Sequence, residues 1–121
     1  MIHLIIGLPG SGKTHFGEKL AEQDNTIFID DVELLRNALP LLAYQDVVLA
    51  HPRLCDIEAL DFTVQFFEEH TEVKLHYFEN DLEQCLINSS KREKKVFESY
   101  IKGLSKNYNA PNGAMKVYKG D

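Results

Sequence analysis

A short segment near the amino terminus has the residue types and spacing of a phosphate-binding loop. It fits the pattern G-x-x-x-x-G-K-[ST], and its members are Gly7, Leu8, Pro9, Gly10, Ser11, Gly12, Lys13 and Thr14. The glycines allow a tight loop whose backbone N–H groups point inward at phosphate oxygens. In such a loop Lys13 reaches the β- and γ-phosphates of a nucleotide, and the Thr14 hydroxyl is a ligand of Mg²⁺. The segment therefore predicts a site for a nucleoside triphosphate with Mg²⁺.

The residues on either side of this loop support that interpretation. Residues 2–6 form an apolar run that indicates a buried strand, and residues 14–23 carry Phe16 and Leu20 at helical spacing. The amino end of the following helix adds a partial positive charge that favours an anion. A glycine-rich turn that only connects two elements is the alternative. The strand before the loop and the helix after it favour phosphate binding.

A pair of acidic residues follows a second short apolar run at residues 26–29. Asp30 and Asp31 would lie at the carboxyl end of a strand, and a carboxylate near the γ-phosphate can accept the proton of an acceptor hydroxyl. Three interpretations of Asp30 stay open. It is a general base, or it binds Mg²⁺ through water in a Walker-B-like strand, or it caps a helix over residues 32–38.

The rest of the chain alternates between short apolar runs and amphipathic segments. We expect further strands at residues 47–50, 73–78 and 116–118 and helices at 56–70, 81–88 and 96–107, with Pro40 ending the helix before it. This alternation predicts an α/β fold, the three-layer P-loop fold with a mainly parallel sheet of four or five strands. Ligands of such folds bind beyond the carboxyl ends of the strands.

Length and composition place the chain among globular proteins. Its 121 residues suit a single domain over 1–121, and 44% apolar with 26% charged residues excludes a disordered chain. No apolar run reaches the roughly 18 residues of a membrane span, so we expect no membrane partner and a cytoplasmic protein. The two cysteines and five histidines lack the spacing of a zinc site.

Charge is distributed unevenly along the chain. Residues 1–85 carry five Lys or Arg against sixteen Asp or Glu, whereas residues 86–121 carry eight against three. A basic carboxyl-terminal third points to a local anion site and argues against salt-driven wrapping of a nucleic-acid duplex. Aromatic residues at helical spacing, Phe62, Phe66, Phe67, Tyr100 and Tyr108, are expected to pack inside the protein.

Several of these features occur together in a known family. The chain resembles the P-loop kinases of the polynucleotide kinase type, especially those of bacteriophages. The resemblance includes residues 8–14, the acidic pair after the second strand, the Tyr-Phe-Glu-Asn-Asp segment at 77–81, the segment at 88–92 and the helix at 96–108. The small size of the chain is similar to that of compact phage kinases that phosphorylate 5-hydroxymethyluracil in DNA.

The resemblance implies roles for particular residues. Asp30 matches the general base of the family, and Arg92 matches the arginine of a lid segment, about 88–96, that clamps the donor phosphates. It implies ATP and Mg²⁺ as cofactors, an acceptor hydroxyl on DNA or a nucleotide, and a central first strand. For a phage protein it also implies the host cytoplasm.

The chain departs from this family after the third strand. The family commonly has an aspartate there, where this chain has His51 before a proline. We expect His51 to hydrogen-bond the acceptor or a phosphate, and Asp31, Arg36 and Arg53 to contact the acceptor. Two alternatives stay open: a kinase of a small molecule such as a nucleoside, nucleotide or sugar, and a nucleotide-binding module without transfer activity.

Overall fold

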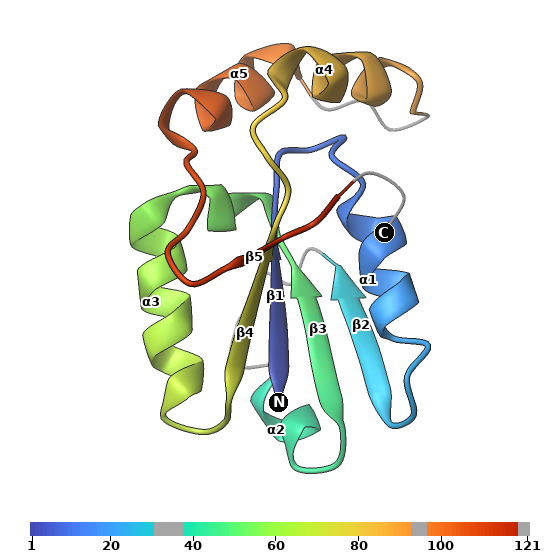
Figure 1. Cartoon of the computed structure of the whole chain (residues 1–121), viewed down its shortest axis with the longest axis vertical. Helices are drawn as coiled ribbons and strands as arrows, with labels where there is room; N and C mark the ends of the chain where they lie inside the picture. Colours follow the sequence, from blue (N-terminus) through green and yellow to red (C-terminus); the bar gives the residue numbers. More distant parts are fainter. Residues whose placement is uncertain (31–37, 93–96, 119–121) are drawn as a thin grey trace.

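The protein is built on one parallel sheet, described here from a computed structural model that covers residues 1–30, 38–92 and 97–118. The strand order is β2-β3-β1-β4-β5, and every neighbouring pair is parallel (Figure 1). The strands are β1 (Ile2–Ile6), β2 (Thr26–Asp30), β3 (Asp46–Ala50), β4 (Val73–Tyr77) and β5 (Met115–Lys116). The expected α/β fold, its parallel sheet and its central first strand are confirmed.

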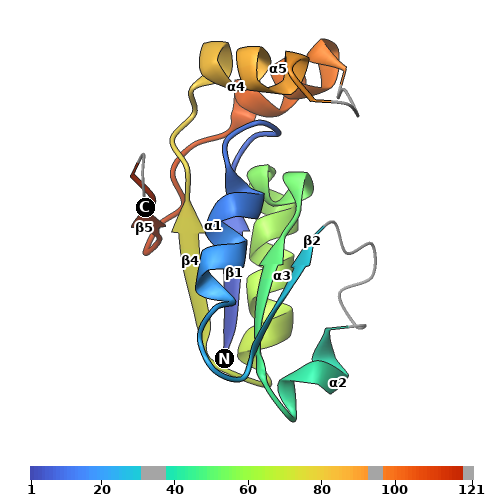
Figure 2. The same ribbon diagram turned by 90° about the vertical axis from the view of Figure 1, so that its right-hand side faces the viewer.

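Helices lie on both faces and at both ends of this sheet. Helix α1 (Lys13–Leu20) lies on one face and α3 (Ile57–Glu68) on the other, which gives three layers (Figures 1 and 2). The short α2 (Leu39–Leu42) lies at the amino ends of the strands. Helices α4 (Leu82–Ser90) and α5 (Glu98–Asn107) lie above the carboxyl ends, over the loop between β1 and α1. The site that the sequence predicts is therefore roofed by two helices.

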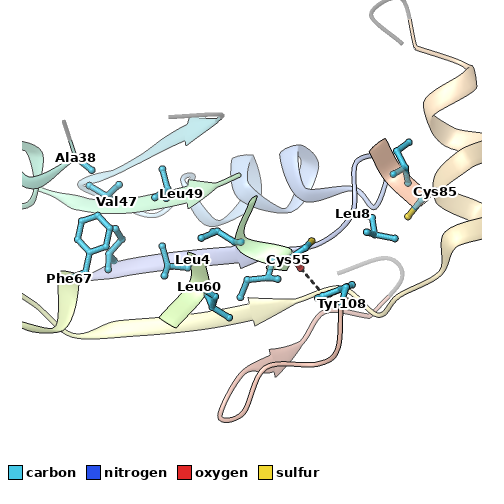
Figure 3. Close-up of a cluster of buried hydrophobic side chains, with 14 residues drawn as sticks. Leu4, Leu8, Ala38, Val47, Leu49, Cys55, Leu60, Phe67, Cys85 and Tyr108 are labelled. Carbon is cyan, nitrogen blue, oxygen red and sulfur yellow. Dashed lines mark hydrogen bonds between the residues drawn. The ribbon is translucent and has the colours of Figure 1, made fainter. Parts of the chain in front are cut away.

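The alternation of side chains along β1 produces two cores. Ile2, Leu4 and Ile6 belong to the larger cluster, which includes Phe67 of α3 (Figure 3). Ile5 points to the other face and packs with Val48 and Ala50 under α1. All five residues of β1 are buried, as a central strand covered on both faces requires.

Some local expectations are wrong, and each difference has a physical reason. Pro40 lies in the first turn of α2, a helix that the sequence did not predict, and proline fits there because it lacks only an N–H that needs no partner. Phe62 is 65% and Tyr100 43% exposed, so neither is a core residue. Phe67 and Tyr108 are buried as expected. The helix expected at residues 32–38 lies outside the described residues except for Ala38.

A buried pair of histidines lies under α1. Nδ1 of His3 on β1 lies 3.0 Å from Nε2 of His76 on β4, and Phe16 of α1 packs its ring edge-on against His76. Burial, followed by the charge of His3 and of Lys74, lowers the pKa of His76 to about 4. Burial also lowers the pKa of His3. Both rings are therefore neutral at pH 7.

Both cysteines are buried as thiols. Cys55 and Cys85 are free and buried, and burial raises the pKa of Cys55 to about 11 and raises that of Cys85. In the described part of the chain, no three His, Cys, Asp or Glu side chains gather as a metal site. Over the same residues, no helix has the length and apolar character to cross a membrane.

Candidate functional site

The phosphate-binding loop connects β1 to α1 and rests on the larger core. Leu8 is fully buried in that cluster, near Cys85 of α4 (Figure 3). Gly10 and Gly12 have φ values of 88° and 103°, which side chains rarely adopt. The Ser11 N–H donates to the Leu8 carbonyl at 3.0 Å and closes the turn. The buried Leu8 thus anchors the loop to the core, and the conformations at positions 10 and 12 favour glycine.

Helix α4 supports the loop from above. A Cβ atom on Gly10 would lie 2.5 Å from the backbone oxygen of Cys85 and 3.0 Å from Oγ of Ser89. The Asn88 side-chain amide donates a hydrogen bond of 2.9 Å to the Gly10 carbonyl. Gln84 in turn donates to the Asn88 oxygen at 2.9 Å, which orients that amide. The helix and the loop therefore form one contact that excludes any side chain at position 10.

Lys13 lies at the amino end of α1, inside the loop. It is 8% exposed, and its ammonium donates a hydrogen bond of 2.6 Å to the Gly7 carbonyl. Such a buried cation is costly unless it has polar partners. The contact holds the ammonium at the loop, close to where phosphate oxygens would enter.

Thr14, in the first turn of α1, contacts Asp30 at the carboxyl end of β2. The Thr14 hydroxyl donates a hydrogen bond of 3.0 Å to Oδ2 of Asp30, which ends β2. The close approach depends on Gly17, because a Cβ there would lie 2.4 Å from the Phe28 ring of β2. Hydroxyl and carboxylate oxygens are hard ligands of the kind that Mg²⁺ prefers. The two side chains therefore fit the expected Mg²⁺ site as well as a general-base role for Asp30.

A cavity of about 100 Å³ joins these residues to the roof of the site. Its lining residues come from the loop, the ends of β2 and β3, and the helical roof: Pro9, Gly10, Lys13, Thr14, Asp30, Pro52, Arg92 and Tyr100. The structure thus brings Lys13, Thr14, Asp30 and Arg92 together, as a phosphoryl-transfer site requires. Residues 93–96 of the expected lid segment lie outside the described part.

The other expected acceptor residues are placed differently. His51 caps a short 3₁₀ helix, Pro52–Cys55, because its Nδ1 accepts a hydrogen bond of 3.0 Å from the Arg53 N–H. Arg53 is exposed, and of residues 51–53 only Pro52 lines the cavity. His51 therefore has a structural role here. Asp31 and Arg36 lie outside the described residues.

A second, larger cavity lies on the other side of Gly10. It measures about 490 Å³ and is lined by Gly10, Ser11, Phe78, Glu79, Asp81, Gln84, Cys85, Asn88 and Val117. Oγ of Ser11 and Oγ of Ser89 are buried without a hydrogen-bond partner among the described residues. The loop therefore has a cavity on each side, and Ser11 lines the larger one.

The segment after β4 fixes the roof of the site. The Asn80 amide donates to the Ser105 carbonyl of α5 at 2.8 Å, and the Ser105 hydroxyl donates back to Asn80 Oδ1 at 2.7 Å. The buried Tyr108 hydroxyl donates to the carbonyl of Phe78 and, at 3.4 Å, to that of Ile6. Phe78 and Asn80, which belong to the segment at 77–81 that resembles the kinase family, therefore connect the end of β4 to α5 and Tyr108.

Sequence reasoning missed three contributors to the site. Tyr100 and Pro52 line the smaller cavity, and Asn88 binds the loop carbonyl of Gly10. Periodicity gave Tyr100 a packing role, since a pattern on one helix does not reveal what lies opposite. Asn88 lay within a segment that resembled the family, but nothing in the sequence indicated its partner 78 residues away.

Comparisons with known proteins extend these observations. No protein-family model matches the chain. The chain is 32% identical over 97 residues to the "Uncharacterized protein R277" of Acanthamoeba polyphaga mimivirus, a match over 74% of this chain and 70% of the relative. A gluconokinase from Sinorhizobium meliloti 1021 superposes with a TM-score of 0.67 and 16% identity, over 98% of this chain and 82% of the other. APE1195 superposes with a TM-score of 0.69 and 19% identity, over 98% and 84%. These structures show that the chain has the fold of a P-loop kinase.

Proposed function

This chain belongs to the family of its mimivirus relative, and we propose that it is an ATP-dependent P-loop kinase that transfers the γ-phosphoryl group to a hydroxyl on DNA or a nucleotide. One observation carries the proposal. Lys13 and Thr14 at the start of α1, Asp30 at the end of β2 and Arg92 after α4 come from three separate places in the chain and line a single cavity. We treat residues 1–121 as one kinase domain.

The donor nucleotide lies along the loop in this proposal. Its phosphates accept hydrogen bonds from the backbone N–H groups of residues 10–14 at the amino end of α1. The Lys13 ammonium exchanges the Gly7 carbonyl for phosphate oxygens, a short movement within the loop. The nucleoside part occupies the larger cavity, which has both apolar walls at Phe78 and Val117 and polar groups at Gln84 and Asn88.

The acceptor hydroxyl meets Asp30 in the smaller cavity. Asp30 accepts the proton of that hydroxyl, and the oxygen forms a bond to the γ-phosphorus while the bond to the β,γ-bridging oxygen breaks. The products are ADP and a phosphorylated acceptor. Arg92 and Lys13 offset the negative charge on the transferring group. Mg²⁺ held by Thr14 would supply further positive charge at the donor phosphates.

Two other functions have an observation in their favour. The gluconokinase fold favours a kinase of a small molecule, because this chain matches it over nearly its whole length. A nucleotide-binding module without transfer activity is favoured by His51, which replaces the aspartate expected after the third strand and bonds its own backbone segment. Both alternatives share the loop with the proposed kinase and differ from it on the acceptor side.

Transfer of γ-³²P from ATP with Mg²⁺ to a panel of acceptors tests the proposal. The panel contains 5′-hydroxyl DNA and RNA, duplex DNA with 5-hydroxymethyluracil, free nucleosides and nucleotides, gluconate, and a sample without acceptor. We expect label on a nucleic acid or nucleotide, and none with Lys13→Ala. Label on gluconate alone would support the small-molecule kinase. ATP binding with no label anywhere would support the binding module.

A further inference from the structure

The acceptor side of the smaller cavity has an aromatic wall. Tyr100 of α5 and Pro52, which follows β3, line the cavity together with Asp30 and Arg92. Tyr100 is 43% exposed, although buried packing is the ordinary role of an aromatic residue at helical spacing. Tyr100 thus lines the cavity and is also partly exposed to solvent.

The charges of the cavity restrict the acceptor. Among the described residues, the cationic side chains that line it are Lys13 and Arg92, and the proposed function assigns both to the donor phosphates. The remaining charged group is the Asp30 carboxylate, which would repel the carboxylate of a sugar acid. A neutral acceptor group beside Asp30 avoids that repulsion.

We propose that Tyr100, which lines the cavity together with Pro52, positions the acceptor by stacking on a planar nucleobase. The inference rests on the proposed function and names its substrate class: the hydroxyl is carried by a nucleoside or a nucleic-acid chain, and a sugar acid, which has no base to stack on Tyr100, is excluded. Base–aromatic stacking supplies affinity without a base-specific hydrogen bond, since every base has a π-face. Tyr100 is thus a positioning residue, and Asp30 carries out the proton transfer.

A fluorescent residue at position 100 tests this binding without any turnover. The chain contains no tryptophan, so Tyr100→Trp creates a single reporter. We expect saturable quenching by thymidine and by a 5′-hydroxyl oligothymidylate, and none by gluconate. Tyr44→Trp is the matched control, because Tyr44 is 82% exposed and lies at the opposite end of the sheet, beyond α2. Quenching by gluconate equal to that by thymidine, or no quenching by either base-bearing ligand, would overturn the inference.

Kinetics of two variants separate stacking from a structural role. Tyr100→Ala is expected to raise the KM for the nucleoside or oligonucleotide roughly 10-fold and to leave the KM for ATP unchanged, whereas Tyr100→Phe retains the wild-type values. An unchanged acceptor KM in Tyr100→Ala would refute the stacking role while leaving the kinase intact. If the wild-type protein labels no acceptor, the proposed function fails, and the fluorescence titration still decides whether position 100 binds a base.

Discussion

The Thr14 hydroxyl in the first turn of α1 and the Asp30 carboxylate at the end of β2 are joined by a hydrogen bond of 3.0 Å, although β3 lies between β2 and β1, the strand that leads into the loop before α1. The bond connects the first turn of α1 to the end of β2. It is made on the side of α1 where Gly17 faces the Phe28 ring. The phosphate-binding loop and the proposed base thus have a fixed relation before any substrate is present.

Asp30→Asn tests the role of this carboxylate. The amide oxygen of asparagine still accepts the bond from Thr14, so the change removes the charge and the basicity but keeps the contact. We expect kcat to fall by roughly 10²- to 10⁴-fold with little change in ATP binding, because a general base contributes that much. The exposed Asp61→Asn on α3 is the control and should match the wild type. A large loss of ATP affinity with normal turnover would instead assign Asp30 to Mg²⁺.

Gly17→Ala tests the packing that brings the two residues together. Alanine favours a helix over glycine by about 1 kcal/mol. The new Cβ would lie 2.4 Å from the Phe28 ring, and overpacking of that kind costs about 1–3 kcal/mol. We therefore expect a lower free energy of unfolding and weaker ATP binding.

Gly103→Ala is the matched control, since nothing lies within 4 Å of a Cβ in that part of α5 and only the helical gain applies. Combining Gly17→Ala with Phe28→Leu should restore part of the loss, because leucine vacates the ring position. Chemical denaturation of the four proteins provides the measurement. A stabilised Gly17→Ala protein would show that α1 can move away from β2 at no cost.

Asn88→Ala tests whether α4 holds the loop in its binding conformation. The variant loses the hydrogen bond to the Gly10 carbonyl, and one such bond contributes about 0.5–1.5 kcal/mol. We expect the Kd for ATP, measured by calorimetry, to rise roughly 2- to 10-fold. Ser90→Ala removes an exposed hydroxyl of the same helix that bonds only the Ile87 carbonyl among the described residues, and serves as control. Equal Kd values for both variants would leave Asn88 without a role in the loop.

The buried histidine pair predicts a loss of stability in acid. The pKa of His76 is about 4 in the folded protein, below its ordinary value of 6.5, so the unfolded chain binds the proton more tightly. The free energy of unfolding should then be level above about pH 6.5. It should fall toward pH 4 with a slope of up to about 1.4 kcal/mol per pH unit from this group.

His76→Gln removes that dependence and keeps a polar group beside His3. The difference in slope between wild type and variant, measured by denaturation between pH 4 and 7, isolates the contribution of the pair. His70→Gln, at the exposed end of α3, is the control. A wild-type slope that persists in His76→Gln would place the acid sensitivity elsewhere.

The sequence predicted the elements that short-range patterns encode. Residues 2–6 match β1 because a buried central strand is apolar throughout, and the loop at 7–14 follows from its glycines and Lys13. The parallel sheet followed from the alternation of strands and helices. The bounds of the helices were less accurate, since the ends of a helix depend on contacts that periodicity does not contain.

Contacts between distant segments were beyond sequence reasoning. His51 was expected to contact the acceptor or a phosphate. Its ring instead accepts a hydrogen bond from the Arg53 N–H, because a 3₁₀ helix begins at Pro52. Tyr100 was given a packing role, and it lines the cavity because α5 crosses above the strands instead of covering a face of the sheet. Both cases concern where a side chain points once the chain is folded.

Gly10 belongs to the walls of both cavities, so the loop separates the cavity proposed for the nucleoside from the cavity proposed for the acceptor. A bisubstrate inhibitor would have to span this loop with its phosphate chain lying over Gly10. The affinity of such an inhibitor would then depend on the number of phosphates that join its two ends.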